Sequence, residues 1–175
     1  MKKIKKLPIY LTFLFLASFF LTSCAPKNET KVTLQLEALG AGPFFSGPNS
    51  LIAEYTVKLS DLKGLENVSK DQIKEIKIKS VSVSLNKEDD IKFDAFTSAT
   101  LQIVGPNTDM QTVAIKNPIK SKNQEISLEV SDEVDIVDYF KGKKLSLVLD
   151  LNFIEDALIE EIGTVIEMEL IVKHN

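Results

Sequence analysis

The chain of 175 residues contains no arginine and no tryptophan, and its positive charge comes from 21 lysines set against 25 acidic residues. Arginine is the side chain that most often recognises phosphates and base edges in a bidentate way. Nucleic acid also binds basic surfaces, whereas this chain has a net charge of −4. We therefore predict no nucleic-acid partner and interpret the acidity as a feature that favours solubility.

Cysteine and histidine each occur once, as Cys24 and His174. A single cysteine cannot form a disulfide within the chain. A tetrahedral zinc site would need carboxylates for most of its ligands, which is unusual, so we expect no metal and no cofactor. His174 is the penultimate residue, and chain ends are often frayed and solvated. We therefore expect no catalytic role for this histidine.

One long apolar run is present, and it lies near the start of the chain, over residues 7–21. Residues 1–6, which precede it, contain four lysines and no acid. The run is shorter than the roughly 20 apolar residues of a membrane-spanning helix. A basic start followed by an apolar core of this length is typical of a secretory signal, so we predict that the protein is exported.

The end of this run, Leu21-Thr22-Ser23-Cys24, resembles the lipobox of bacterial lipoproteins. The resemblance implies that the Cys24 thiol receives a diacylglycerol, that the signal is cut before Cys24, and that the new amine is acylated. More than one acyl chain is enough for stable anchoring in a membrane. The expected organisation is a signal peptide over 1–23, a lipidated cysteine and polar tether over 24–31, and one domain over 32–175.

The same resemblance bears on location. Removal of residues 1–23 would take away four lysines and no acid, leaving a formal charge of −8. In Bacteroidota lipoproteins, acidic residues directly after the cysteine favour export to the cell surface. Here Ala25, Pro26 and Lys27 stand in that place. We therefore expect a lipid anchor in the bacterial cell envelope, in the outer membrane, with the periplasmic side favoured over the surface.

Most of the remaining chain alternates between apolar and polar residues, which is typical of half-buried strands. The run from Leu145 to Phe153, with every second residue apolar, is the clearest case. A long strand is predicted over 76–85, and its inward parity changes across Lys79-Ser80, which predicts a bulge or an exchange between sheets. The other predicted strands lie over 32–38, 51–59, 99–103, 113–115, 126–130 and 166–172.

Helical signals are short and fall between the strands. Ser69 and Gln72 have the spacing of a capping box, and Phe93-Asp94-Ala95-Phe96 predicts a single turn. Asp132 can cap a short helix whose apolar face includes Val134, Val137 and Phe140. Over 154–162 a helical turn and a long hairpin loop both remain open. About eight strands with helical turns in the connections predict an all-β fold, a two-layer antiparallel β-sandwich of immunoglobulin-like or jelly-roll type.

The order of these elements is similar to that of small Bacteroidota β-sandwich lipoproteins. The turn at residues 93–96 before a strand and the segment 134–140 before the last strand pair carry this similarity. It implies the sandwich fold and an envelope location, and it brings no activity with it.

Acidic runs offer a possible site for chemistry: Glu88-Asp89-Asp90, Asp132-Glu133-Asp135, Glu155-Asp156 and Glu160-Glu161. Paired carboxylates could serve glycoside hydrolysis or bind calcium. However, none of these runs has the spacing or the central glycine of an EF-hand. Acidic runs in loops are mostly solvated, so we keep a carbohydrate-active enzyme or a calcium-dependent adhesin as the alternative hypothesis.

The loop over 40–49 is a candidate binding site, because it places Phe44 and Phe45 side by side among glycines and prolines. Neighbouring residues of a regular strand point to opposite faces, so both rings cannot point inward. One ring is then exposed to a sugar or an apolar ligand, unless both plug the end of the sandwich. Our interpretation is a non-enzymatic envelope lipoprotein with a binding or accessory role toward an envelope protein or glycan.

Overall fold

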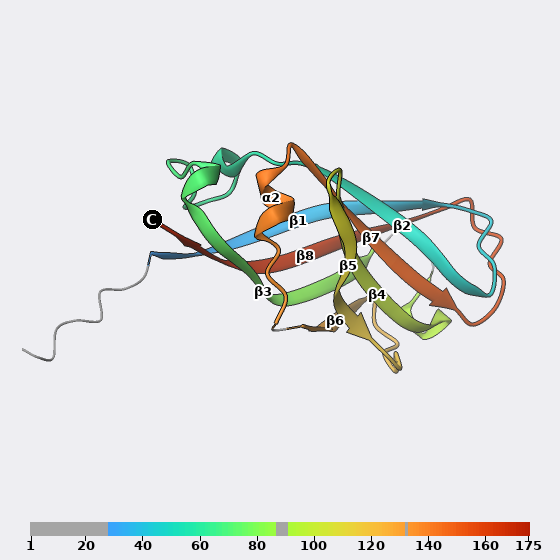
Figure 1. Ribbon diagram of the computed structural model, residues 1–175. Helices are drawn as coiled ribbons and strands as arrows, with labels where there is room; N and C mark the ends of the chain where they lie inside the picture. Colours follow the sequence, from blue (N-terminus) through green and yellow to red (C-terminus); the bar gives the residue numbers. More distant parts are fainter. Residues whose placement is uncertain (1–27, 87–90, 132) are drawn as a thin grey trace, which may run out of the picture.

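The computed structural model describes residues 28–86, 91–131 and 133–175, which fold into a closed barrel of eight antiparallel strands (Figure 1). Around the barrel the strand order is β1-β2-β7-β4-β5-β6-β3-β8, and β8 pairs with β1 to close it. The strands are β1 (Glu29–Ala41), β2 (Gly47–Thr56), β3 (Ile73–Leu85), β4 (Phe96–Gly105), β5 (Thr108–Lys116), β6 (Glu125–Val130), β7 (Lys144–Phe153) and β8 (Glu161–His174). The prediction of an all-β fold is confirmed.

The alternating residues point into the barrel as predicted. In β7 the five apolar residues from Leu145 to Phe153 are each at most 3% exposed, and the residues between them are half-buried or exposed. The first strand starts earlier than expected, because Glu29 already pairs with Lys173 of β8. Residues 29–31 of the predicted tether therefore belong to the barrel.

The predicted open sandwich of two layers is not confirmed, because hydrogen-bonded ladders join the strands into a ring. Two of the ladders are short. The β1–β2 ladder contains one register pair, Leu39 with Ile52, and the β5–β6 ladder contains two, Ala114 with Val130 and Ile115 with Glu129. These few pairs complete the ring of strands. The alternation of apolar and polar residues does not show which strands pair, so the sequence could not predict this closure.

Bulges adjust which side chains face the core. The register of β3 against β8 shifts between Ile78 and Ser80, so Ile78 and Val81 both lie inside. This confirms the change of parity predicted at that point. A second shift in β5 places the neighbouring residues Val113 and Ala114 inside and leaves Ile115 42% exposed. The prediction that Val113 and Ile115 share one face was wrong for this reason.

The helical connections are short, as expected. The 3-10 turns are η2 (Leu59–Asp61), η3 (Lys70–Gln72) and η4 (Phe93–Ala95), and the helix α2 (Val137–Lys141) lies beside β3 and β7 (Figure 1). In η3 the Gln72 side chain accepts a hydrogen bond from the Ser69 backbone N–H at 2.8 Å, the reciprocal half of a capping box. The segment 154–160 is a loop that joins β7 to β8, which are not neighbours in the barrel.

Both described ends of the chain lie at the same end of the barrel, and the β1–β2 and β7–β8 loops lie at the opposite end (Figure 1). The expectation of a frayed C-terminus was wrong. His174 is part of β8 and pairs with Ile73, and its backbone N–H donates to the Asn28 carbonyl at 3.0 Å. Its ring Nε2 lies 2.9 Å from the Thr30 hydroxyl. The histidine therefore helps to join the end of β8 to the start of β1.

Candidate functional site

Three large apolar side chains are exposed on the loops at the end of the barrel opposite the chain termini. Phe45 is 61% exposed, Ile154 is 50% exposed and Leu158 is 94% exposed. Phe45 comes from the β1–β2 loop, and the other two come from the β7–β8 loop. We call these three residues the apolar rim. Because two well-anchored loops carry it, the rim is a candidate docking surface.

The two phenylalanines of the predicted site have opposite environments. Phe44 is 2% exposed and stacks on Phe153, with 5.2 Å between ring centroids and 7° between the ring planes. Phe153 in turn meets Phe96 edge-on at 4.7 Å. The ring of Phe44 therefore seals this end of the core, whereas the ring of Phe45 faces solvent. Of the two predicted binding residues, Phe45 is the one accessible to a partner.

Backbone hydrogen bonds join the two loops of the rim. Phe44 and Ala157 exchange both of their backbone hydrogen bonds, at 3.0 and 2.8 Å, as in a short antiparallel bridge. The Gly42 N–H donates to the Glu160 carbonyl at 2.7 Å. The Ser46 N–H donates to Asp156 Oδ1 at 2.8 Å. Since each loop satisfies backbone groups of the other, their geometry does not depend on a partner.

A glycine and an asparagine allow this arrangement. A Cβ atom at Gly42 would lie 1.8 Å from the Ile159 carbonyl oxygen, so only glycine permits the two loops to approach this closely. The Asn49 amide binds the backbone of Phe45 on both sides, because its Nδ2 donates to the Phe45 carbonyl at 2.7 Å and its Oδ1 accepts from the Phe45 N–H at 3.3 Å. Gly47 between them has a φ of +103°, which favours glycine. The base of Phe45 is therefore fixed before any partner binds.

A hollow of about 390 Å³ adjoins the rim. Its walls are partly apolar, from Ile91, Phe153 and Ile154, and partly acidic, from Asp94 and Glu155. Small-molecule and side-chain sites in proteins have volumes of this order, from about 300 Å³ upward. The rim and the hollow together can take up an apolar group with a polar or charged flank.

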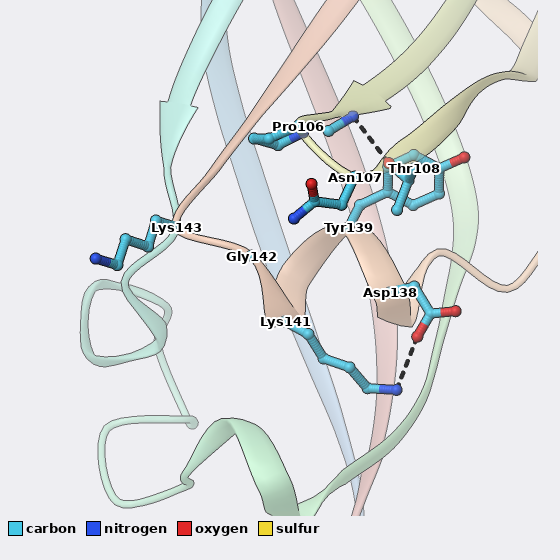
Figure 2. A pocket seen from close by; sticks show the side chains of 9 residues that line it. Pro106, Asn107, Thr108, Asp138, Tyr139, Lys141, Gly142 and Lys143 are labelled. Atoms are coloured by element: carbon cyan, nitrogen blue, oxygen red, sulfur yellow. Dashed lines mark hydrogen bonds and ion pairs between the residues drawn. The ribbon is translucent and has the colours of Figure 1, made fainter.

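A second cavity, of about 620 Å³, lies at the opposite end of the barrel between the β4–β5 turn and α2 (Figure 2). Figure 2 shows Asn107 near the centre of the view, the Tyr139 ring beside it near Thr108, and Lys143 extending away from both. The Tyr139 hydroxyl donates to the Asp109 carbonyl at 2.7 Å, and burial together with the nearby Asp109 raises the pKa of this phenol. Tyr139 thus joins α2 to β5.

Two charged residues that line this second cavity, Asp138 and Lys141, are paired with each other. The Lys141 ammonium lies 2.7 Å from Asp138 Oδ1, and this hydrogen bond raises the pKa of Lys141 (Figure 2). The Lys70 ammonium donates to the Gly142 carbonyl. Because the Asp138, Tyr139 and Lys141 side chains have internal partners, we regard this cavity as a junction between elements rather than as the leading binding site.

The acidic runs do not form a metal-binding cluster in the described residues. Asp135 has a structural role, because its Oδ1 accepts hydrogen bonds from the Ile76 and Val137 backbone N–H groups, each at 3.0 Å. It therefore fixes the start of α2 against β3, where the sequence had suggested Asp132. Asp132 and the run over 88–90 lie outside the described residues, as does Cys24. Nowhere in the described part of the chain do three histidine, cysteine, aspartate or glutamate side chains come close enough to hold a metal ion.

Sequence reasoning identified Phe45 and missed Ile154 and Leu158. Their spacing with Ile162 left a helical turn and a long hairpin loop open, and the structure has a loop there, with Ile162 fully buried in β8 and Leu158 almost fully exposed. A usable signal was present, because acidic pairs flank Leu158 on both sides within the segment 155–161. A short apolar segment, Ala157-Leu158-Ile159, enclosed by two acidic pairs is more typical of an exposed loop than of a core element. In the described ranges, no helix has the length and apolarity needed to cross a bilayer.

No family model matches the chain, and no curated protein matches it in sequence. Among solved structures, it is similar to a chain of the nora virus structure, with a TM-score of 0.37 and 13% identity over 85% of this chain. This chain spans 61% of the length of that one. A tomato aspermy virus chain gives a TM-score of 0.32 at 13% identity, with 92% of both chains covered. A turnip yellow mosaic virus chain gives 0.26 at 9% identity, over 83% of this chain and 94% of that one. Similarities at this level carry no argument about function.

Proposed function

We propose that the protein is a lipid-anchored protein of the bacterial envelope that binds another envelope component through the apolar rim, without catalysis. The anchor rests on Cys24 and its resemblance to a lipobox. The location that we propose is the outer membrane, on the periplasmic side. The binding role rests on one observation above all, the exposure of the Phe45 ring on a loop that internal hydrogen bonds hold in place.

The geometry of the barrel supports a rim that faces away from the anchoring membrane. Four residues lie between Cys24 and Glu29, where β1 begins, and these five Cα-to-Cα steps span at most about 18 Å. The thirteen residues of β1 then extend about 40 Å to the opposite end of the barrel. A lipid at Cys24 would hold the termini near the bilayer and direct the rim toward the space beyond it. The partner is then a component of that space rather than the anchoring membrane.

A fixed, exposed aromatic side chain supports binding more directly than exposure alone does. Tyrosine, tryptophan and phenylalanine supply large contact areas at low cost in conformational entropy. The two hydrogen bonds of Asn49 restrict the backbone of Phe45 before binding, which reduces that cost further. Phe45 is thus suited to be the central anchor of a small interface.

Site-specific photocrosslinking in the native envelope tests this function. A photoreactive residue at Phe45 should form a discrete covalent adduct, while the same residue at Met110 should not. Met110 is a matched control, because it is 52% exposed and lies near the other end of the barrel. Equal adducts at both positions, or none at Phe45, would contradict the proposed binding role.

We also infer that the barrel is a flattened jelly roll. The short β1–β2 and β5–β6 ladders support a division into two four-stranded halves, β2-β7-β4-β5 and β6-β3-β8-β1. Eight strands in this order are typical of a jelly roll, whereas the immunoglobulin-like alternative has seven or nine strands. Amide hydrogen exchange tests the division, because protection should be lower in both short ladders than in the β1–β8 ladder.

A further inference from the structure

We infer that the apolar rim receives a cationic segment of a partner protein, in which an apolar side chain is flanked by lysine or arginine. This inference rests on the proposed function and narrows it to one class of partner. The evidence for it is the charge around the rim, an observation separate from the exposed Phe45 ring on which the binding role rests.

The charge around the rim is strongly one-sided. The segments 42–46, 91–95 and 154–161 form the rim and the wall of the adjoining hollow, and they contain five acids and a single lysine, Lys92. All five carboxylates are exposed: Asp94, Glu155, Asp156, Glu160 and Glu161. Within the described ranges, none of these five forms an ion pair with a lysine. Asp156 accepts a hydrogen bond from the Ser46 backbone.

Two other lysines at this end of the barrel line a different cavity from the one beside the rim. Lys116 is the last residue of β5 and Lys120 lies in the connection between β5 and β6, and both line a separate cavity of about 450 Å³. Their charge is therefore not part of the rim. The other charged residues with described ion pairs, such as Lys173 with Glu75 and Lys141 with Asp138, are already compensated by a partner within the barrel.

This distribution decides between classes of partner. An anionic lipid surface or a nucleic acid would be repelled by five exposed carboxylates. A neutral glycan could stack on Phe45, but it would gain nothing from the acids. A cationic segment would gain from both features, since its apolar side chain would contact Phe45 and Leu158 while its charges would face Glu155 and Glu160. Complementary charge of this kind mainly sets specificity and association rate.

A library of random 12-residue peptides provides the test, with the full lipidated protein held in discs of zwitterionic lipid as the target. We expect selection to enrich peptides that combine net positive charge with at least one large apolar residue. Enrichment should be lost with Phe45→Ser and retained with Met110→Ser. It should shift toward uncharged sequences with the combined variant Glu155→Gln, Glu160→Gln and Glu161→Gln, in which the shape of the rim is kept.

The affinity of one enriched peptide then provides a quantitative check. Raising the salt concentration from about 0.05 to about 0.5 M should weaken its binding at least tenfold for the natural rim, and less than about threefold for the triple amide variant. Peptides that depend on Phe45 but show no charge preference would overturn the cationic partner and leave the binding role intact. Failure to enrich any peptide, enrichment of acidic peptides, or self-association of the protein through Phe45 would also overturn it. Loss of the proposed function itself would be seen separately, as an absence of the Phe45 photocrosslink.

Discussion

Replacing each of the two neighbouring phenylalanines by alanine should give sharply different losses of stability. Phe44 is 2% exposed and stacks on Phe153, so Phe44→Ala removes a ring from the sealed end of the core. Large-to-small changes of this kind cost about 3–5 kcal/mol of unfolding free energy. For a domain of about 150 residues, each kcal/mol lowers the melting temperature by about 2–4 °C. The expected loss for Phe44→Ala is therefore roughly 6–20 °C.

Phe45→Ala should behave as a surface change. Its ring is 61% exposed, and such positions usually alter the free energy of unfolding by no more than about 0.5 kcal/mol. The melting temperature should then move by no more than about 2 °C, while binding of an enriched peptide is lost. Thermal melts followed by circular dichroism measure both variants, with Phe44→Leu as a control of intermediate loss. Equal shifts for the two alanine variants, or a larger one for Phe45→Ala, would refute the assignment of one ring to the core and the other to the site.

Three further predictions address the anchor, the core and the charges. Metabolic labelling with a fatty acid should mark the natural protein and not Cys24→Ala, and label retained by the variant would remove the basis for the anchor. Leu149→Asp should abolish the folded circular dichroism spectrum, because Leu149 is fully buried and the new charge would have no partner; Val148→Asp, on the half-exposed outer face of the same strand, should fold. The hydrogen bond from Lys173 lowers the pKa of Glu75 below its ordinary 4.5. The stabilisation from this ion pair is fully present above the ordinary pKa of 4.5, and it is lost as the pH falls through the lowered pKa of the folded protein. From pH 6 to pH 3, the melting temperature of Lys173→Met should therefore fall by less than that of the natural protein. Equal falls in the two proteins would contradict a stabilising role for the Glu75–Lys173 pair.

The alternation of apolar and polar residues was sufficient to locate the strands, because a strand places successive side chains on opposite faces. The five inward positions of β7, from Leu145 to Phe153, could be read directly. The bulge near Lys79 was also predictable, since two apolar runs of opposite parity met there. In β5 the bulge fell within a run too short to show its parity, and the side of Ile115 was therefore predicted wrongly.

The site was only partly predictable from the chain. The pair Phe44 and Phe45 signals one buried and one exposed ring, but the sequence does not say which, since that depends on Phe153 being available beneath Phe44. Leu158 could not be assigned to the same site, because more than 100 residues separate it from Phe45. The Phe44–Ala157 bridge brings the two loops together, and such a pairing has no local sequence signature.

By itself, the sequence determined the all-β character, the approximate strands and the burial of alternate residues in each strand, and the resemblance of Leu21–Cys24 to a lipobox is the basis of the proposed anchor. These features depend on local periodicity or on a short contiguous motif. The tertiary structure alone decided that the ladder closes into a barrel, that His174 pairs with the start of the domain, and that the rim lies at the end opposite the termini. Each of these depends on which distant strands pair, and the free energy of that choice comes from contacts between residues far apart in the chain.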